Sequence, residues 1–231
     1  MKKMHLQKLT LAAIGLFLTL SCSKDEAPAP VAKTEVTIGT QVWATKNLDV
    51  ATYSDGTPIP EVDAAEWWTV GTGAWCYYEN NTANGKTYGK LYNWFAVAGI
   101  HDYDPNTPNK MLAPTGWHVP SDAEWTTLRD YLGGESVAGS KMKATGNSLW
   151  VSFNTDATNS SGFSALPAGF RDNRGSLPFI GLGDTCVWWS SSELLNFPTL
   201  VSFWKVTPYT GDFQTNSNLK NFGFSVRCVK D

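Results

Sequence analysis

The sequence predicts an α+β domain, rich in strands and loops, with a mixed sheet and about two helices. Three observations support this fold class. The chain contains 11 Trp, 11 Phe and 8 Tyr residues, and aromatic residues are enriched in strands. Short apolar segments alternate with turn-forming Gly, Pro, Asn and Asp, as in chains of short strands. Only a few segments have the 3.6-residue spacing of an amphipathic helix.

Residues 1–21 have the organisation of a lipoprotein signal peptide. Lysines precede an apolar run over residues 9–20, which is too short for a membrane span because about 20 apolar residues are needed. Ser21 and Cys22 resemble the end of a bacterial lipobox, so we expect cleavage before Cys22 and lipidation of its thiol. The common lipobox has Leu where this chain has Thr19, and an ordinary signal peptide cut near Ser21 is the alternative.

Residues 22–34 are expected to form a flexible tether that the lipid on Cys22 holds to the membrane. The Ala-Pro-Ala-Pro sequence at residues 27–30 disfavours helix and sheet. The Lys-Asp-Glu sequence at residues 24–26 resembles the export signal of some Bacteroidetes lipoproteins. We therefore expect an outer-membrane lipoprotein at the cell surface, with the periplasmic face of that membrane as the alternative.

The charge of the chain argues against a nucleic-acid partner. The formal net charge is -3, and removal of the first 21 residues takes away three lysines and no acidic residue. The mature chain is therefore more acidic and offers no basic face. Its length of about 200 residues is typical of one domain, which we place at residues 35–231.

The mature chain begins with strands and turns. Residues 36–43 place apolar anchors on either side of a Gly-Thr turn and predict a hairpin. Residues 55–58, Asp-Gly-Thr-Pro, have the chemistry of a turn. Residues 74–79 predict a second aromatic strand.

The clearest helix begins after Ser121. The Ser121 side chain can accept from the backbone of Glu124 while Glu124 reaches back, which is the capping box that opens a helix. The apolar residues that follow share one helix face: Trp125, Leu128 and Leu132. A shorter helix is predicted over residues 90–98.

The C-terminal third reads as strands and turns. Residues 187–189 and 203–206 are aromatic strand candidates. Residues 222–228 alternate apolar and small or polar side chains, which predicts a strand with one buried face. A strand so close to residue 231 suggests that this end of the chain is held in a sheet.

Three cysteines follow Cys22 in the mature chain: Cys76, Cys186 and Cys228. Export permits a disulfide, and three cysteines allow one bridge in any of three pairings. Because there is no Cys-x-x-Cys motif and the mature chain has only two histidines, we expect neither a metal site nor a cofactor.

Seven ordered segments resemble the Fibrobacter succinogenes major paralogous domain, which is common in lipoproteins of Bacteroidetes and Fibrobacter. They are TIGTQVWATKNLDV, AWCYYEN, YGKLYNWFAV, APTGWHVPSDAEWTTL, GFSALPAGFRDNRGSL, VWWSSSE and GFSVRCVKD. The resemblance implies no established biochemical activity. It favours a bridge between Cys76 and Cys228, because both lie in family segments.

That family is in turn similar to the C-type-lectin-like fold, which the resemblance therefore implies here. The matching features are the Pro-Ser-x-x-Glu-Trp helix start, the Trp-Trp-Ser-Ser strand and the closing Gly-Phe-Ser-Val-Arg-Cys segment. The chain lacks the Glu-Pro-Asn or Gln-Pro-Asp loop and the Trp-Asn-Asp strand of calcium-dependent lectins. It also lacks the copper-binding cysteine pair of formylglycine-generating enzymes. Both specialised activities are disfavoured.

We expect a ligand site around Trp188 and Trp189. Successive strand residues point to opposite faces, so one of the two rings should be exposed and able to stack on a sugar. The plainer interpretation is that one Trp faces the core and that the turn residues only shape loops. The complete candidate set is Arg171, Asp172, Asn173, Asp184, Trp188, Trp189 and Glu193.

We expect no catalytic residue. His118 has no nucleophile motif beside it, Glu124 fits the helix cap, and residues 102–106 lack the Gly and closing Glu of a calcium loop. The expected function is a non-catalytic recognition or adhesion module for a glycan or protein ligand. A polysaccharide-degrading enzyme and a purely structural envelope component are the alternatives.

Overall fold

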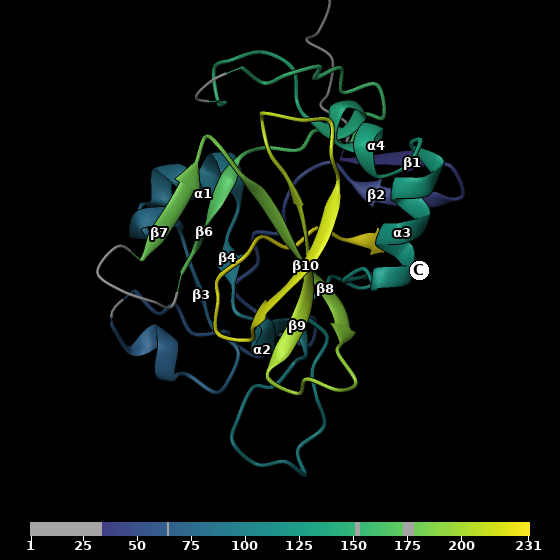
Figure 1. Ribbon diagram of the computed structural model, residues 1–231. Helices are drawn as coiled ribbons and strands as arrows, with labels where there is room; N and C mark the ends of the chain where they lie inside the picture. Colours follow the sequence, from purple (N-terminus) through teal and green to yellow (C-terminus); the bar gives the residue numbers. More distant parts are fainter. Residues whose placement is uncertain (1–33, 64, 151–152, 173–177) are drawn as a thin grey trace, which may run out of the picture. The chain divides into compact units, whose positions relative to one another are not determined.

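The computed structural model describes residues 34–63, 65–150, 153–172 and 178–231 (Figure 1). The predicted signal peptide, Cys22 and Asn173 lie outside the described residues. Within the described part, helices and short antiparallel strands are mixed, which confirms the α+β class. Among the same residues, no helix has the length and apolar character needed to span a bilayer.

The two ends of the described chain meet in one sheet. Strands β1 (Glu35–Ile38) and β2 (Gln41–Ala44) form the predicted hairpin, and Gly39 supplies the positive φ of its turn. Strand β11 (Val229–Lys230) lies between β2 and β5 (Trp117–His118). The prediction that the C-terminal end is held in a sheet is confirmed.

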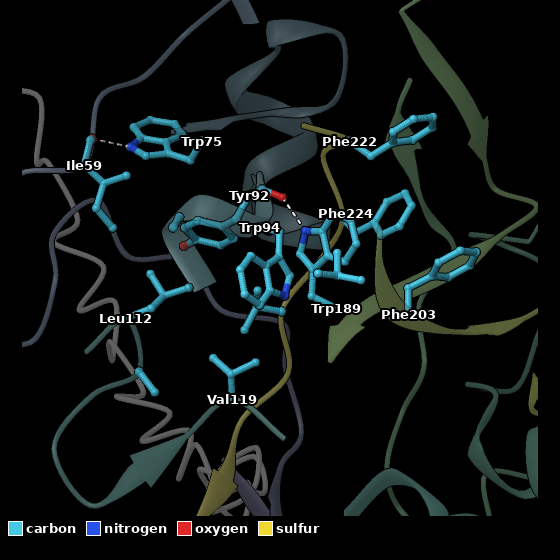
Figure 2. Packing of buried hydrophobic residues seen from close by; sticks show 14 of the residues in the cluster. Ile59, Trp75, Tyr92, Trp94, Leu112, Val119, Trp189, Phe203, Phe222 and Phe224 are labelled. Atoms are coloured by element: carbon cyan, nitrogen blue, oxygen red, sulfur yellow. Dashed lines mark hydrogen bonds between the residues drawn. The ribbon is translucent and has the colours of Figure 1, made fainter. Parts of the chain in front are cut away.

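A second sheet separates two hydrophobic cores. It consists of β8 (Cys186–Glu193), β9 (Leu200–Val206) and β10 (Gln214–Leu219), with β9 in the middle. Trp189 belongs to the first core, which Figure 2 shows, and Trp188 belongs to the second core. Strand β8 is therefore covered on both faces.

The segment 222–228 is also buried on both faces, which corrects the prediction of one buried face. Phe224 pairs with Tyr92 and packs in the first core, 4.2 Å from Trp189 between ring centroids (Figure 2). On the other side, Arg227 stacks over Phe163 of the second core. Single bridges also connect the segment to two short pairs of strands. One pair is β3 (Trp75–Cys76) with β4 (Leu91–Tyr92), and the other is β6 (Ala168–Arg171) with β7 (Phe179–Leu182).

The predicted helix after Ser121 is confirmed as α3 (Asp122–Tyr131). Both halves of the capping box are present, with Glu124 Oε2 accepting from the Ser121 backbone at 2.8 Å. Trp125 and Leu128 are fully buried on its inner face.

The helix predicted over residues 90–98 is shorter than expected. Leu91 and Tyr92 form β4, and only α2 (Trp94–Val97) is helical. The reason is Asn93, whose side-chain oxygen caps α2 and also accepts from the Ala74 backbone, so that the residues before it pair as a strand.

Further helical segments were not predicted from the pattern. They are η1 (Ala65–Thr69), η2 (Tyr78–Asn80), α1 (Thr82–Tyr88) and α4 (Glu135–Met142). The Asn-rich sequence at residues 80–85 contains the start of α1, where the Asn81 side chain accepts from the backbone of Ala83.

Candidate functional site

The predicted exposure of one tryptophan in the Trp188–Trp189 pair is wrong. The two rings do point to opposite faces of β8, but both side chains are 0 % exposed because a core covers each face. Their indole N–H groups are satisfied inside, by Asn47 Oδ1 for Trp188 and by the Tyr92 carbonyl for Trp189 (Figure 2). Neither ring can stack on a ligand.

The other members of that candidate set are not gathered into a site. Arg171 and Asp172 are buried, and the Arg171 guanidinium donates to the Val62 carbonyl at 3.0 Å. Asp184 accepts from the Tyr209 hydroxyl, whereas Glu193 is exposed and pairs with Lys220.

The Cys76–Cys228 bridge implied by the resemblance is absent. Cys76, Cys186 and Cys228 are free thiols. Cys228 lies in the first core, Cys186 in the second core, and Cys76 in a third, smaller hydrophobic cluster. Burial raises the pKa of Cys76 to about 11 and that of Cys228 to about 12, so both stay protonated at neutral pH. The three cysteines act as small apolar core residues.

A depression of about 480 Å³ offers a better binding site. We call it the Trp68 depression. It is formed by η1, α2, the connection from β8 to β9, and the end of β10. Its walls combine apolar and hydrogen-bonding side chains, as small-ligand sites do. The lining residues are Trp68, Thr69, Val70, Gly71, Phe95, Pro198, Thr199, Leu219, Lys220 and Asn221.

The 3-10 helix η1 splits an aromatic pair between core and solvent. Trp67 is 1 % exposed and Trp68 is 58 % exposed. Trp67 donates to the Asn221 carbonyl at 2.7 Å, and the Asn221 amide donates to the Trp68 carbonyl at 2.9 Å. These two hydrogen bonds fix the Trp68 backbone against the segment after β10, so the position of the exposed ring is defined by the fold.

Lys220 closes one edge of the Trp68 depression. Its ammonium lies 4.6 Å above the ring of the buried Trp94 and 2.9 Å from the Glu193 carboxylate. The Trp94 indole donates to the Ser190 carbonyl, which fixes the ring beneath the lysine. Because Glu193 balances its charge, Lys220 adds a hydrogen-bond donor to the wall without adding net charge.

A second depression of about 310 Å³ adjoins the first at Gly71, which lines both. We call it the Tyr103 depression. The loop over residues 100–109 forms most of its wall, and Tyr103 is 78 % exposed there. Asp102 and Asp104 stand on the same loop, with backbone amides donating to an oxygen of each. The loop is exposed, in agreement with its interpretation as a solvated segment.

His118 lies between two carboxylates that the sequence pattern did not place beside it. Nε2 is 2.6 Å from Glu124 Oε1, and Nδ1 is 2.7 Å from Asp231 Oδ1. Burial of the ring lowers its pKa, but the hydrogen bonds that the ring donates to the Glu124 and Asp231 carboxylates outweigh burial and raise the pKa of His118 above 6.5. Since both ring nitrogens are engaged, His118 ties the start of α3 to the C-terminal end.

This histidine tie predicts a pH-dependent stability. The His118 pKa is raised on folding, so its contribution is full below 6.5 and is lost as the pH rises through the folded pKa. Burial raises the pKa of Glu124, but the hydrogen bonds that its carboxylate accepts from Ser121 and His118 outweigh burial and lower the pKa below 4.5. We expect His118→Gln to lower the free energy of unfolding by about 1 kcal/mol near pH 5.5. The loss should shrink by pH 8, as measured by urea unfolding at both pH values; an equal loss at both would contradict the tie.

The model of the Fibrobacter succinogenes major domain matches residues 36–230, nearly the whole described chain. The chain belongs to this family. The resemblance stated from the seven sequence segments is thereby confirmed. No curated protein and no solved structure matches this chain. In this member the Trp68 and Tyr103 depressions both lie inside the matched region.

Sequence reasoning missed Trp68 because residues 62–73 contain no regular pattern. One signal was available: Trp67 and Trp68 are adjacent aromatic residues between Pro60 and the glycines at positions 71 and 73. In an irregular connection on the surface, a core cannot easily cover both rings.

Proposed function

We propose that this protein is a lipid-anchored recognition module of the cell envelope that binds a carbohydrate in the Trp68 depression. The exposed indole of Trp68 carries the proposal, because an aromatic face can stack on the apolar face of a sugar ring. Thr69, Thr199 and Lys220 supply hydroxyl and ammonium groups around it for the sugar hydroxyls.

We place the domain outside the membrane because the proposed lipid anchor and tether precede it in the sequence. Figure 1 shows the β1–β2 hairpin in the upper part of the view and the teal loop over residues 100–109 at the bottom. The tether proposed for residues 22–34 leads into β1. We propose that lipidated Cys22 and this tether hold the domain at the outer face of the outer membrane.

We also propose that the fold is of the C-type-lectin-like class. Support comes from the three sequence features that carry this resemblance. Strand β8 contacts both of the other features: its Trp188 packs against Trp125 of the capped helix α3, and its Trp189 packs against Phe224 of the segment 222–228. The proposed binding site does not use a calcium ion.

A polysaccharide-degrading activity is less well supported. The ten residues that line the Trp68 depression, all within the described chain, include no Asp or Glu. Hydrolysis of a glycosidic bond generally uses two carboxyl groups across the bond. A protein ligand is the second candidate, because Leu195 is 99 % exposed and Phe197 58 % exposed beside the depression.

The test is a glycan and polysaccharide panel probed with the full chain in detergent and with Trp68→Ala. We expect saturable binding to at least one glycan, weakened about tenfold or more by Trp68→Ala because the stacking surface is lost. Tyr131→Ala is the matched control, since Tyr131 is 65 % exposed on α3 and lies outside the depression. Chromatography of the bound glycans would show whether any bond is cleaved.

Binding that is equally strong in wild type and Trp68→Ala would reject this site. If no glycan binds, Leu195→Ser becomes the informative variant. Leu195 does not line the depression, so its replacement should affect only a protein ligand.

A further inference from the structure

We infer that the ligand is a neutral oligosaccharide of several sugar units, lying in a groove that runs from the Trp68 depression into the Tyr103 depression. This inference rests on the proposed function and adds to it the length and the charge of the ligand. A site for a single sugar ring would need only one of the two depressions.

Continuity is the first argument for an extended ligand. The two depressions have volumes of about 480 Å³ and 310 Å³ and share Gly71 in their walls. Each alone is in the lower half of the range for ligand pockets, about 300–1,000 Å³. Exposed aromatic rings stand on both sides of the shared residue, Trp68 on one side and Tyr103 on the other. Two stacking platforms along one path suit a chain of linked rings.

Gly71 allows the Tyr103 ring to lie close to the backbone where the two depressions meet. A Cβ atom at position 71 would lie 3.2 Å from Tyr103 Cε1, so any side chain here would press against the ring. The φ of Gly71 lies outside the left-handed region, so its backbone conformation does not itself require glycine. A larger residue here should therefore displace the exposed Tyr103 ring from its place in the groove.

Charge is the argument for a neutral ligand. Asp102 and Asp104 line the Tyr103 depression. The only ammonium in the Trp68 depression is that of Lys220, and Glu193 already balances it. Asp102 lies 3.3 Å from His101 Nε2, which lines the same depression. An anionic sugar polymer would still meet the carboxylate of Asp104, whereas neutral hydroxyls can donate to both carboxylates.

The experiment compares ligand lengths by titration calorimetry on the full chain in detergent. The probes are cello-, laminari-, xylo- and manno-oligosaccharides of two and six units, with hexagalacturonate as the anionic probe. We expect the six-unit form of the neutral ligand to bind about tenfold more tightly than its two-unit form, and hexagalacturonate to bind at least tenfold more weakly than the neutral hexamer.

Three variants separate the groove from the primary site. Tyr103→Ala should abolish the gain from chain length and leave two-unit binding unchanged. Gly71→Val should also abolish the gain from chain length, whereas Trp68→Ala should weaken the binding of both lengths. Tyr131→Ala again serves as the exposed aromatic control. Thermal melting followed by circular dichroism verifies that each variant is folded.

The outcomes distinguish the two proposals. Equal affinity for two and six units, or a length gain that survives both Tyr103→Ala and Gly71→Val, overturns the groove and leaves Trp68-dependent sugar recognition standing. Preferred binding of hexagalacturonate overturns the assignment of a neutral ligand. Failure of every probe to bind, or binding unaffected by Trp68→Ala, overturns the proposed function and the groove with it.

Discussion

Trp125→Ala is expected to lower the free energy of unfolding by about 3–5 kcal/mol, because the substitution leaves a large cavity in a close-packed core. Trp125 is 0 % exposed, and its ring centroid lies 4.7 Å from that of Trp43 and 5.7 Å from that of Phe213. The surrounding indoles cannot move in to fill the space. Those of Trp188 and Trp204 are fixed by hydrogen bonds to Asn47 and Asp122.

The measurement is urea unfolding followed by far-ultraviolet circular dichroism, and Trp68→Ala is the matched control. It removes the same side chain from a position that is 58 % exposed, so we expect a change within about 0.5 kcal/mol. A loss of less than about 1 kcal/mol in Trp125→Ala would mean that the second core repacks around the cavity. This comparison also establishes whether Trp68→Ala is folded when its sugar binding is measured.

Elements with local sequence signals could be predicted. The start of α3 follows from Ser121 and Glu124, whose hydrogen bonds span only three residues, and the hairpin around Gly39 follows from its turn and flanking apolar residues. Neither depends on distant parts of the chain. The family assignment was accessible for a similar reason, since its blocks are contiguous segments.

The burial of Trp188 and Trp189 could not be predicted from the strand itself. Period-two alternation places the two rings on opposite faces correctly, but which faces are covered depends on segments far away in sequence. Phe224 covers one face and Trp125 the other. The disulfide prediction was wrong for the same reason, because three separate clusters hold the three thiols.

The candidate site was harder to predict than the fold. Trp68 lies on the short 3-10 helix η1 and Tyr103 on an irregular loop, and residues of α2 and of the end of β10 also line the Trp68 depression. A tertiary hydrogen bond from Asn221 fixes the Trp68 backbone. Composition indicated that aromatic residues were available for a ligand, but only the packing of Trp67 decides which ring remains outside.

Lys143 is a buried cation for which the described residues provide backbone carbonyls, and no carboxylate, as hydrogen-bond partners. The residue is 0 % exposed, just beyond the end of α4. Its ammonium donates to three backbone carbonyls, at 2.7 Å to Thr155, 3.3 Å to Thr207 and 2.9 Å to Thr210. Burial lowers the pKa of Lys143, which reflects the cost of desolvating its charge. The ammonium bonds to two loops, which the backbone hydrogen bond from Thr155 N–H to the Pro208 carbonyl at 2.8 Å also joins.

We therefore expect Lys143→Met to lower the free energy of unfolding by about 3 kcal/mol. Methionine has a similar length but no donor, so three carbonyls lose a partner at about 1–3 kcal/mol each, and the removed desolvation cost offsets part of this loss. Urea unfolding measures the difference, with Lys141→Met as the control, because Lys141 lies in α4 and is only partly buried. The control should stay within about 0.5 kcal/mol of wild type. If Lys143→Met is as stable as wild type, the three hydrogen bonds only balance the cost of burying the charge, and the ammonium fixes the positions of the two loops without a net gain in stability.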